Sequence, residues 1–330
     1  MSVKITPELA LFGYFLVSLI SSYCLSRLFI RIWKSYCNVR KVPKGVGFIF
    51  SLFLFGHIFL NDSSQGTNIF MALVVFVSII YLLDDFINLS PFIRIFLIAA
   101  FSGSVVLFSK IDFMEFYINH AVGVFILFFV LNFYLVNMTN FYDGADLNLA
   151  LLMVLFNLNI ILLSDFDSEL FKISIMSIGF VFGFSYLNKK PNTLYFGDAG
   201  SFVFSSYIIY VIDAFWRKDG FIIPVVLVPL LLPSIDVCLT LLYRLCKKEN
   251  VLTRNHYHIY QRLETNFKSK FYLLPQIVNF LCCHVFVSFY PVERARYIFE
   301  VGFFLSIISL FIYLIFNLFC IQKLKNKLYR

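Results

Sequence analysis

Long apolar runs separated by short polar stretches follow one another along the whole chain. A helix that crosses a lipid bilayer needs about 20 predominantly apolar residues, and most of these runs approach that length. The pattern therefore predicts eleven membrane-spanning segments. They are Leu9–Ile32, Gly45–Leu60, Ile69–Leu83, Pro91–Phe108, Ala121–Val136, Leu147–Leu163, Leu170–Leu187, Ser201–Phe215, Phe221–Leu245, Phe271–Phe289 and Tyr297–Ile321.

Two of these segments have further sequence signals. Leu9–Ile32 is too long for the core of a signal peptide, and no small-residue cleavage site follows it, so we expect a retained helix. Phe221–Leu245 contains Pro224, Pro229 and Pro233. Proline removes a backbone donor and clashes with the preceding turn of a helix, so we expect this segment to be kinked or broken.

The overall composition agrees with a membrane protein. Of the 330 residues, 60% are hydrophobic and only 14% are charged, whereas a soluble domain carries about 25% charged residues. The mean hydropathy is +0.85. These values exclude a soluble enzyme, a disordered chain and a fibrous repeat. The eleven segments leave only short connections, so the chain is predicted to be one all-α transmembrane domain over residues 1–330.

The orientation follows from the positive charges in the connections. Most of the loop lysines and arginines lie after the first, seventh, ninth and eleventh segments, and positively charged loops stay in the cytoplasm. The N-terminus is therefore predicted outside and the C-terminus in the cytoplasm. The net charge of +8 then reflects membrane topology and attraction to anionic lipids, and no nucleic-acid partner is expected.

Acidic residues gather at the ends of three segments. Asp84 and Asp85 end the third segment, Asp143 and Asp146 follow the fifth, and Asp198 follows the seventh. On the predicted topology all five lie at the cytoplasmic face. Carboxylates in or beside membrane spans are costly and usually functional. The simpler alternative is that they are solvated loop acids or helix N-caps.

Such a cluster has a preferred chemistry. Several carboxylates cannot all stay ionised close together without a cation between them. Hard oxygen ligands select Mg²⁺ or Mn²⁺ over zinc. Because Mg²⁺ usually completes its shell with water and phosphate oxygens, the cluster suggests a diphosphate substrate at the membrane surface.

Four short motifs carry this chemistry. Tyr81–Pro91 (YLLDDFINLSP) ends a helix in two acids, and Asn137–Asp146 (NMTNFYDGAD) spaces amide and acid groups around a glycine. Gly197–Ser201 (GDAGS) opens a helix whose free N–H groups are expected to hold a phosphate. Arg254–Arg262 (RNHYHIYQR) supplies cationic and hydrogen-bonding groups. A zinc site at the His-x-His pair of this last motif is the weaker alternative.

In their order and spacing, the four motifs resemble those of the polyprenyl-phosphate N-acetylhexosamine-1-phosphate transferases, which form glycosyltransferase family 4. This superfamily includes the bacterial phospho-N-acetylmuramoyl-pentapeptide transferase. The stretch His256–Gln261 is most similar to the bacterial branch that initiates O-antigen synthesis. The resemblance implies a multi-pass protein of the bacterial inner membrane whose active site faces the cytoplasm.

The activity implied by this resemblance is a glycosyl-1-phosphate transfer. A sugar-1-phosphate, from N-acetylhexosamine or deoxy-N-acetylhexosamine, would pass from a UDP-sugar to undecaprenyl phosphate. UMP would be released, and the lipid-linked sugar would begin an O-antigen or another cell-envelope glycan. The family also implies that Mg²⁺ is required.

The resemblance further implies roles for the acids and one amide. Asn140 and Asp198 match the magnesium ligands of the family. Asp84 and Asp85 match its aspartate pair, of which the first accepts a proton from the lipid phosphate or only orients it. Asp143 matches a catalytic-site acid of unassigned role.

Other residues match substrate contacts. Arg94 lies where relatives direct a cation toward the diphosphate, with a helix-end arginine that reaches for the membrane surface as the alternative. Gly144 and Asp146 match residues that hold the uracil. Tyr195 lies where an aromatic ring stacks on the uracil, with an interfacial tyrosine as the alternative. Asn137 begins the same motif and is a further expected substrate contact.

The last motif is expected to reach the sugar and the diphosphate through Arg254, His256 and His258. The active site is thus predicted to form from cytoplasmic loops at about residues 33–44, 84–91, 137–146, 188–200 and 246–270. In the first of these, Asn38–Gly47 is a shortened proline-glycine stretch whose lysines are expected to contact phosphate.

Two positions are less regular. The family pattern DGxDGL is Asp143-Gly-Ala-Asp146-Leu-Asn here, so its second glycine is absent and Leu147 follows Asp146. Asp236 lies inside the proline-rich ninth segment. It is either buried near the site or a hydrogen-bonded structural acid.

Two other classes of function fit part of the pattern. A proton- or ion-coupled transporter also uses intramembrane acids and broken helices, although inverted repeats would be expected there. A scaffold or flippase for the same lipid would need no metal ligands. Relatives often form dimers, which makes a homodimer one expectation, alongside membrane lipids as partners.

Overall fold

The structure is a computed structural model that describes residues 6–36, 42–60, 64–87, 89–108, 121–166, 168–190, 193–219, 222–251, 256–267, 270–289 and 298–328. Within these ranges the chain is helical and contains no strand. A short 3-10 helix, η3, spans Lys270–Leu273. The α-helices are α1 (Pro7–Tyr36), α2 (Gly47–Leu60), α3 (Gln65–Ile87), α4 (Pro91–Phe108), α6 (Ala121–Tyr142), α7 (Asn148–Leu163), α8 (Glu169–Asn188), α9 (Gly197–Asp219), α10 (Ile223–Val226), α11 (Val228–Cys246), α12 (Ile259–Asn266), α13 (Leu274–Phe289) and α14 (Ile298–Leu328).

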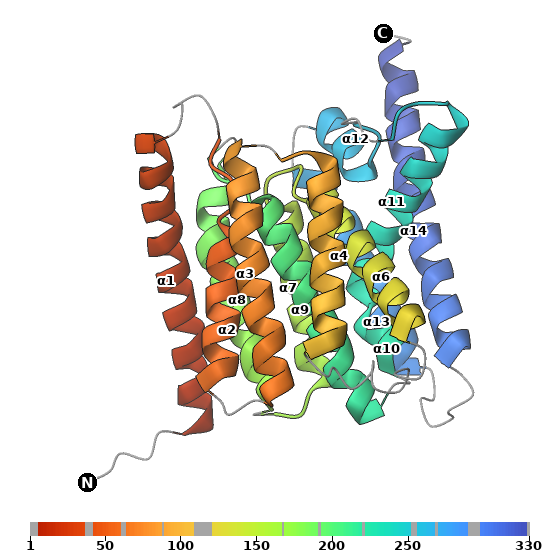
Figure 1. Cartoon of the computed structure of the whole chain (residues 1–330). Helices are drawn as coiled ribbons and strands as arrows, with labels where there is room; N and C mark the ends of the chain where they lie inside the picture. Colours follow the sequence, from red (N-terminus) through yellow and green to blue (C-terminus); the bar gives the residue numbers. More distant parts are fainter. Residues whose placement is uncertain are drawn as a thin grey trace.

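Each predicted apolar segment coincides with helical structure. Among the described residues, eight helices are long and apolar enough to cross a membrane, and α2, α4 and α7 are shorter apolar helices. The protein is therefore an all-α, multi-pass membrane protein. The helices form one bundle, with α1 beginning at its lower end and α14 ending at its upper end (Figure 1). The number of spans and the orientation in the membrane stay predictions.

The predicted break in the ninth segment is confirmed. The segment is divided into α10 and α11, with Leu227 between them. Pro224 and Pro229 lie in the first turns of the two helices, where a missing N–H costs little. Pro233 lies inside α11. The prolines thus set where each helix begins, as their backbone chemistry requires.

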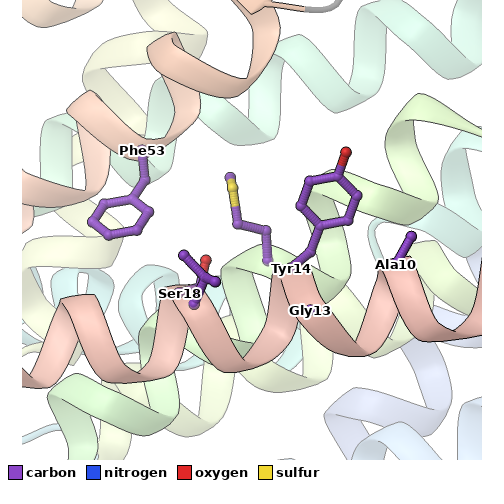
Figure 2. Close-up of a pocket in the computed structure, with 7 residues that line it drawn as sticks. Ala10, Gly13, Tyr14, Ser18 and Phe53 are labelled. Carbon is purple, nitrogen blue, oxygen red and sulfur yellow. The ribbon is translucent and has the colours of Figure 1, made fainter. Parts of the chain in front are cut away.

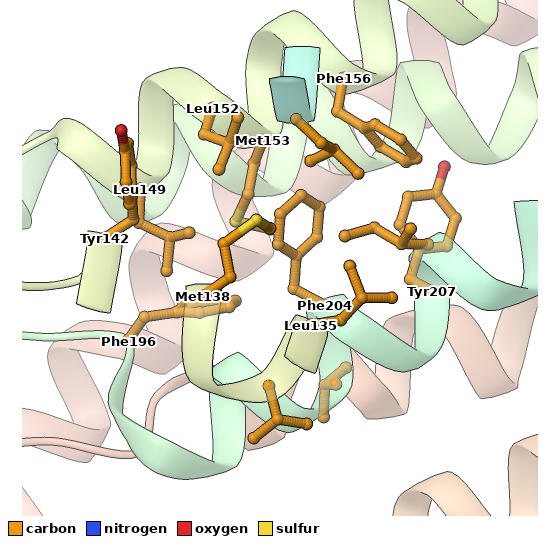
Figure 3. Packing of buried hydrophobic residues seen from close by; sticks show 14 of the residues in the cluster. Leu135, Met138, Tyr142, Leu149, Leu152, Met153, Phe156, Phe196, Phe204 and Tyr207 are labelled. Carbon is orange, nitrogen blue, oxygen red and sulfur yellow. The ribbon is translucent and has the colours of Figure 1, made fainter. Parts of the chain in front are cut away.

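Helix α9 is the centre of the bundle, since 89% of its apolar window is buried. It packs against α2, α3 and α6. Figure 3 shows Met138 of α6, Phe156 of α7 and Phe204 and Tyr207 of α9 packed together in this core. The Tyr207 hydroxyl donates to Asn157 Oδ1 at 2.8 Å, so a buried polar group is satisfied where no water is at hand.

Small residues let α1 lie close against α8. A Cβ atom added at Gly179 or Gly183 of α8 would collide with backbone carbonyl groups of α1. The Ser22 hydroxyl of α1 also donates to the carbonyl of Phe180 at 2.7 Å. This is the packing expected inside a membrane, where close backbone approach and interhelical hydrogen bonds replace the hydrophobic effect.

An apolar cavity of about 340 Å³ lies between α1, α2 and α8 (Figure 2). None of the residues expected to carry chemistry lines it, so the candidate site lies elsewhere. Its lining residues are Ala10, Gly13, Tyr14, Val17, Ser18, Phe53 and Met176.

Candidate active site

Four helix ends bring the predicted polar residues together at one end of the bundle. Asp84 and Asp85 lie in the last turn of α3, and Arg94 lies in the first turn of α4. Asn140 lies in the last turn of α6, and Asp198 in the first turn of α9. Asp85 and Asp198 are in contact although they are 113 residues apart in sequence.

Arg94 connects two of the acids. Its Nε lies 2.7 Å from Asp84 Oδ2, its Nη2 donates to Asp84 Oδ1 at 3.2 Å, and its Nη1 lies 3.1 Å from Asp198 Oδ2. Asp84 is only 1% exposed, and its Oδ1 also accepts the backbone N–H of Leu89. The Arg94 side chain stays 35% exposed. Arg94 is therefore held in place by carboxylates, and one side of it remains accessible.

Asp198 is the junction of the cluster. Its Oδ1 accepts a hydrogen bond from Asn140 Nδ2 at 2.8 Å, while its Oδ2 faces Arg94. The Asp198 side chain is 21% exposed. Asp198 is therefore the acid of this cluster that lies beside both a cation, Arg94, and an amide, Asn140.

Asp85 caps the beginning of α9. Its two carboxylate oxygens accept the backbone N–H groups of Asp198 at 3.2 Å and Ala199 at 3.4 Å. Carboxylates are favourable at a helix N-terminus because they satisfy N–H groups that lack partners within the helix and complement the helix dipole. For this acid, the simple N-cap interpretation describes the contacts that the structure shows.

Asp143 binds the backbone N–H groups of the two residues before Asp198 in the same way. It accepts the N–H groups of Gly197 at 2.8 Å and Phe196 at 3.4 Å. Burial raises the pKa of Asp143 to about 7, although these two hydrogen bonds and the nearby Lys44 oppose the shift. Its proton uptake therefore falls near neutral pH.

These contacts correct one expectation. The N–H groups at the start of α9 were predicted to be free to hold a phosphate, but four successive ones already donate to carboxylates. Acidic side chains at this position also repel an anion. A phosphate at this end of the bundle would need cationic side chains, and Arg94 and the half-buried Lys44 lie near these acids.

The stretch before α2 lies directly against the start of α9. Tyr195 N–H donates to the carbonyl of Pro43 at 3.0 Å, and Gly47 N–H donates to the carbonyl of Phe196 at 3.1 Å. A Cβ atom at Gly47 would collide with the backbone of Gly200. The absence of a side chain at Gly47 allows this close crossing, which places Lys44 near Asp85 and Asp143.

The turn at the position of the absent family glycine contains a residue in the left-handed conformation. Leu147 has φ 64°, in the left-handed region that glycine adopts easily and a leucine adopts at a cost. Its N–H donates to Asn188 Oδ1 at 2.7 Å, and Asn188 Nδ2 donates to the carbonyl of Leu194. The hydrogen bonds from Asn188 thus hold a turn that the sequence alone put in question.

Restoring a glycine here tests that strain. We expect Leu147→Gly to be less destabilising than Leu151→Gly by about 1–2 kcal/mol, the usual cost of a left-handed residue with a side chain. Leu151 is a matched control, since it is also a half-buried leucine of the same region but lies within α7 without a positive φ. Thermal unfolding of both variants in the same detergent measures the difference. Equal losses would show that Leu147 carries no strain.

Two tyrosines support the segment that follows α6. The Tyr260 hydroxyl of α12 donates to the carbonyl of Phe141 and lies where a Cβ of Gly144 would be. The Tyr272 hydroxyl of η3 donates to the carbonyl of Asp146 at 2.6 Å. Gly144 is exposed, while Asp146 is half-buried. Helix α12 and η3 therefore cover one side of this segment.

A second group of polar residues lies around Asp146. Tyr195 is half-buried, and burial followed by the nearby Asp146 and Asp143 raises its pKa. Burial also raises the pKa of Asp146, with Lys270 opposing the shift. Glu264 of α12 has a raised pKa for the same reason, with Asp146 as the second cause. Tyr195, Asp146 and Glu264 thus influence one another electrostatically.

The histidine motif is divided. His258 is buried, and its Nδ1 lies 3.3 Å from Asp236 Oδ2. His256 is exposed. Arg254 lies outside the described residues. Asp236 itself is fully buried, and it is paired with His258, a residue of the predicted site.

Asn137 has a local partner. Its Nδ2 donates to the carbonyl of Phe133, one turn earlier in α6, at 2.7 Å. In the described structure this amide therefore bonds to its own helix and to none of the acids named above.

Sequence reasoning missed Glu264, Tyr260 and Tyr272. Tyr260 is part of the RNHYHIYQR motif, so its proximity to the site was available as a signal. Glu264 lies one turn further along α12, on a helix too polar and too short for the hydrophobic pattern to reveal. Tyr272 begins an apolar run and looks like an ordinary interfacial residue.

The residues fit Mg²⁺ better than a metal with a full protein cage. Within the described ranges, no group of three or more His, Cys, Asp or Glu side chains is placed to hold a metal ion. Asp198 and Asn140 supply hard oxygen atoms, since rotating the amide exchanges its oxygen and nitrogen. One or two such ligands, completed by water and phosphate, are the usual Mg²⁺ arrangement. Asp198 and Asn140 are therefore the pair that would hold it.

Part of the chain matches a known protein family. Residues 67–214 match the sequence profile described as glycosyl transferase family 4, and this range contains Asp84, Asp85, Arg94, Asn140 and Asp198. A search of curated proteins finds no match.

Proposed function

Because this chain belongs to glycosyl transferase family 4 through residues 67–214, we propose that it transfers a sugar-1-phosphate from a UDP-N-acetyl sugar to undecaprenyl phosphate. The family supports a polyprenyl-phosphate sugar-phosphate transferase in general. The particular sugar, N-acetylhexosamine or deoxy-N-acetylhexosamine, and the lipid acceptor are our proposal. The product would initiate an O-antigen or another envelope glycan at the cytoplasmic face of the bacterial inner membrane.

One observation carries this proposal. Arg94 is fixed between Asp84 and Asp198, beside Asn140, at an end of a bundle of membrane-spanning helices. A lipid phosphate anchored in the bilayer and a water-soluble nucleotide sugar can meet only at such an end. A partly exposed guanidinium held by carboxylates is suited to bind phosphate oxygens there.

The reaction requires one bond to form and one to break. An oxygen of the lipid phosphate attacks the phosphorus that carries the sugar. The bond from this phosphorus to the oxygen of the UMP unit breaks, and UMP leaves with the electron pair. Negative charge builds on the phosphate oxygens, where Arg94 and the nearby Lys44 stabilise it electrostatically.

The burial of Asp84 favours a positioning role over a role as a base. Both of its oxygens are engaged by Arg94 or by the Leu89 N–H, and the residue is 1% exposed. Such a group is poorly placed to take a proton from a substrate. We infer that Asp84 positions Arg94, and that the lipid phosphate, mostly ionised near neutral pH, needs no base.

The nucleoside would lie on the other side of Asp198. Tyr195 offers an aromatic face, and Gly144 is exposed on the side that the Tyr260 hydroxyl does not fill. Asp146, which lies near Tyr195, offers a hydrogen-bond acceptor to the base. Asp198 and Asn140 would hold Mg²⁺, which would neutralise part of the charge of the diphosphate.

The proposal is tested by substrate omission. Protein purified in detergent should release UMP from a UDP-N-acetylhexosamine only when undecaprenyl phosphate and Mg²⁺ are both present. Mass spectrometry of the lipid fraction should show a polyprenyl-diphosphate sugar. Absence of UMP and of the lipid product over a broad panel of UDP-sugars would overturn the proposal and favour a transporter or a lipid scaffold.

A further inference from the structure

Asp236 of α11 makes two contacts with the chain that begins α12. Its Oδ1 accepts the backbone N–H of Ile259 at 2.9 Å, and its Oδ2 lies 3.3 Å from His258 Nδ1. Asp236 is 0% exposed and His258 is 2% exposed. The Tyr142 hydroxyl is a further hydrogen-bonding neighbour of the carboxylate. One buried acid thus holds both the start of α12 and an imidazole.

The imidazole lies against the segment that carries Asn140. The His258 ring packs on Phe141, with ring centres 5.3 Å apart, and stacks on Tyr260 at 6.0 Å. The Tyr260 hydroxyl in turn donates to the carbonyl of Phe141. His258 is therefore fixed at the edge of the candidate site by two rings and by Asp236.

An acid that served only to cap α12 would need only one of its two carboxylate oxygens. Capping α12 uses Oδ1, whereas Oδ2 and His258 Nδ1 both lack a hydrogen-bond partner among the described residues, and these two atoms face each other at 3.3 Å. A buried carboxylate is costly unless a donor faces it. The hydrogen on the imidazole is therefore expected on Nδ1, toward Asp236.

This tautomer leaves a defined group on the other side of the ring. In a neutral imidazole one nitrogen donates and the other accepts, so a hydrogen on Nδ1 makes Nε2 an acceptor. Within the described ranges Nε2 is buried and has no hydrogen-bond partner. A buried acceptor without a partner is costly, and a ligand that donates a hydrogen bond would recover that cost.

We propose that Asp236 is a positioning residue that fixes His258 as the Nδ1–H tautomer, so that Nε2 accepts a hydrogen bond from a hydroxyl or amide group of the sugar-phosphate substrate. This inference rests on the proposed function and assigns the sugar side of the same site. It extends the site to α11, a helix outside the residues that match the family.

The first test examines the tautomer without any turnover. The chain has five histidines, so ¹⁵N spectra of ring-labelled protein contain few signals, and His258→Gln identifies those of His258. In the wild type we expect a protonated Nδ1 and an unprotonated Nε2. In Asp236→Asn the new amide still accepts from Ile259 but donates to Nδ1, so the hydrogen should move to Nε2.

The second test measures turnover. Asp236→Asn should lower kcat/KM for the sugar nucleotide by about 10- to 100-fold, as the loss of a partner that orients a histidine does elsewhere. Because Asp236 is proposed to act only through His258, the double variant with His258→Gln should be no slower than His258→Gln alone. Asn317→Ala is the matched control, since it removes the amide oxygen that accepts from Arg262 Nη1 of α12 at 2.6 Å.

The outcomes separate the two proposals. An unchanged tautomer in Asp236→Asn, or losses that add in the double variant, would overturn the positioning role. An Asn317→Ala variant as slow as Asp236→Asn would show that any loosening of α12 has this effect, which also overturns it. A wild type that makes no lipid product with any sugar would instead overturn the proposed function, while the tautomer result would remain valid.

Discussion

Replacing Asp198 with asparagine is expected to lower kcat on the order of 1000-fold, the scale seen when a group that stabilises transition-state charge is removed. Asparagine has nearly the same size, so α9 should still begin at the same place. The variant loses the charge that faces Arg94 at 3.1 Å and the carboxylate that would bind Mg²⁺ beside Asn140. The measurement is UMP release at saturating Mg²⁺ and substrates, with helical content checked by circular dichroism.

A matched acid provides the control. Glu8 is the acidic residue in the first turn of α1, as Asp198 is in the first turn of α9, and it is exposed. Glu8→Gln makes the same carboxylate-to-amide change away from the cluster and should keep the wild-type rate. Retention of half the wild-type rate by Asp198→Asn would contradict the role assigned to Asp198.

Arg94→Gln should both destabilise the protein and stop turnover. The change leaves Asp84, which is 1% exposed, as a buried carboxylate without its cation. Breaking a buried pair costs about 3–5 kcal/mol, and the lower end applies because the Arg94 side chain is 35% exposed. The expected loss is therefore about 3 kcal/mol in the free energy of unfolding, measured by thermal or denaturant unfolding in detergent.

A second variant separates stability from function. Adding Asp84→Asn to Arg94→Gln removes the uncompensated charge, so most of the lost stability should return. Turnover should not return, because the cation that faces the diphosphate is still missing. If the double variant regained activity along with stability, Arg94 would be a structural residue and not a substrate contact.

The helical architecture was largely available from the sequence. The eleven apolar segments and the proline break between α10 and α11 follow from local features, namely the length of apolar runs and the missing N–H of proline. The bilayer makes this possible, because every backbone group within it must be satisfied inside its own helix. The hydrophobic pattern did not show which contacts the residues at the helix ends make, as at Asp84 and Asp85.

The contacts that each acid makes were less predictable from the sequence. The motifs placed Asp85, Asp143 and Asp198 at one membrane face, but nothing in them showed that the first two would cap α9. That outcome corrected the expected phosphate site at the helix N-terminus. Leu147 is a similar case, since its left-handed backbone depends on Asn188, which lies 41 residues further along the chain.

The sequence by itself determined the membrane character of the chain, the helices and the chemical types gathered near their ends. These properties depend on residues close together in the chain. Only the tertiary structure decided which groups are partners: Arg94 with both Asp84 and Asp198, and Asp236 with His258. Hydrogen bonds and ion pairs act over about 3 Å, so their partners depend on where distant segments meet after the helices have packed.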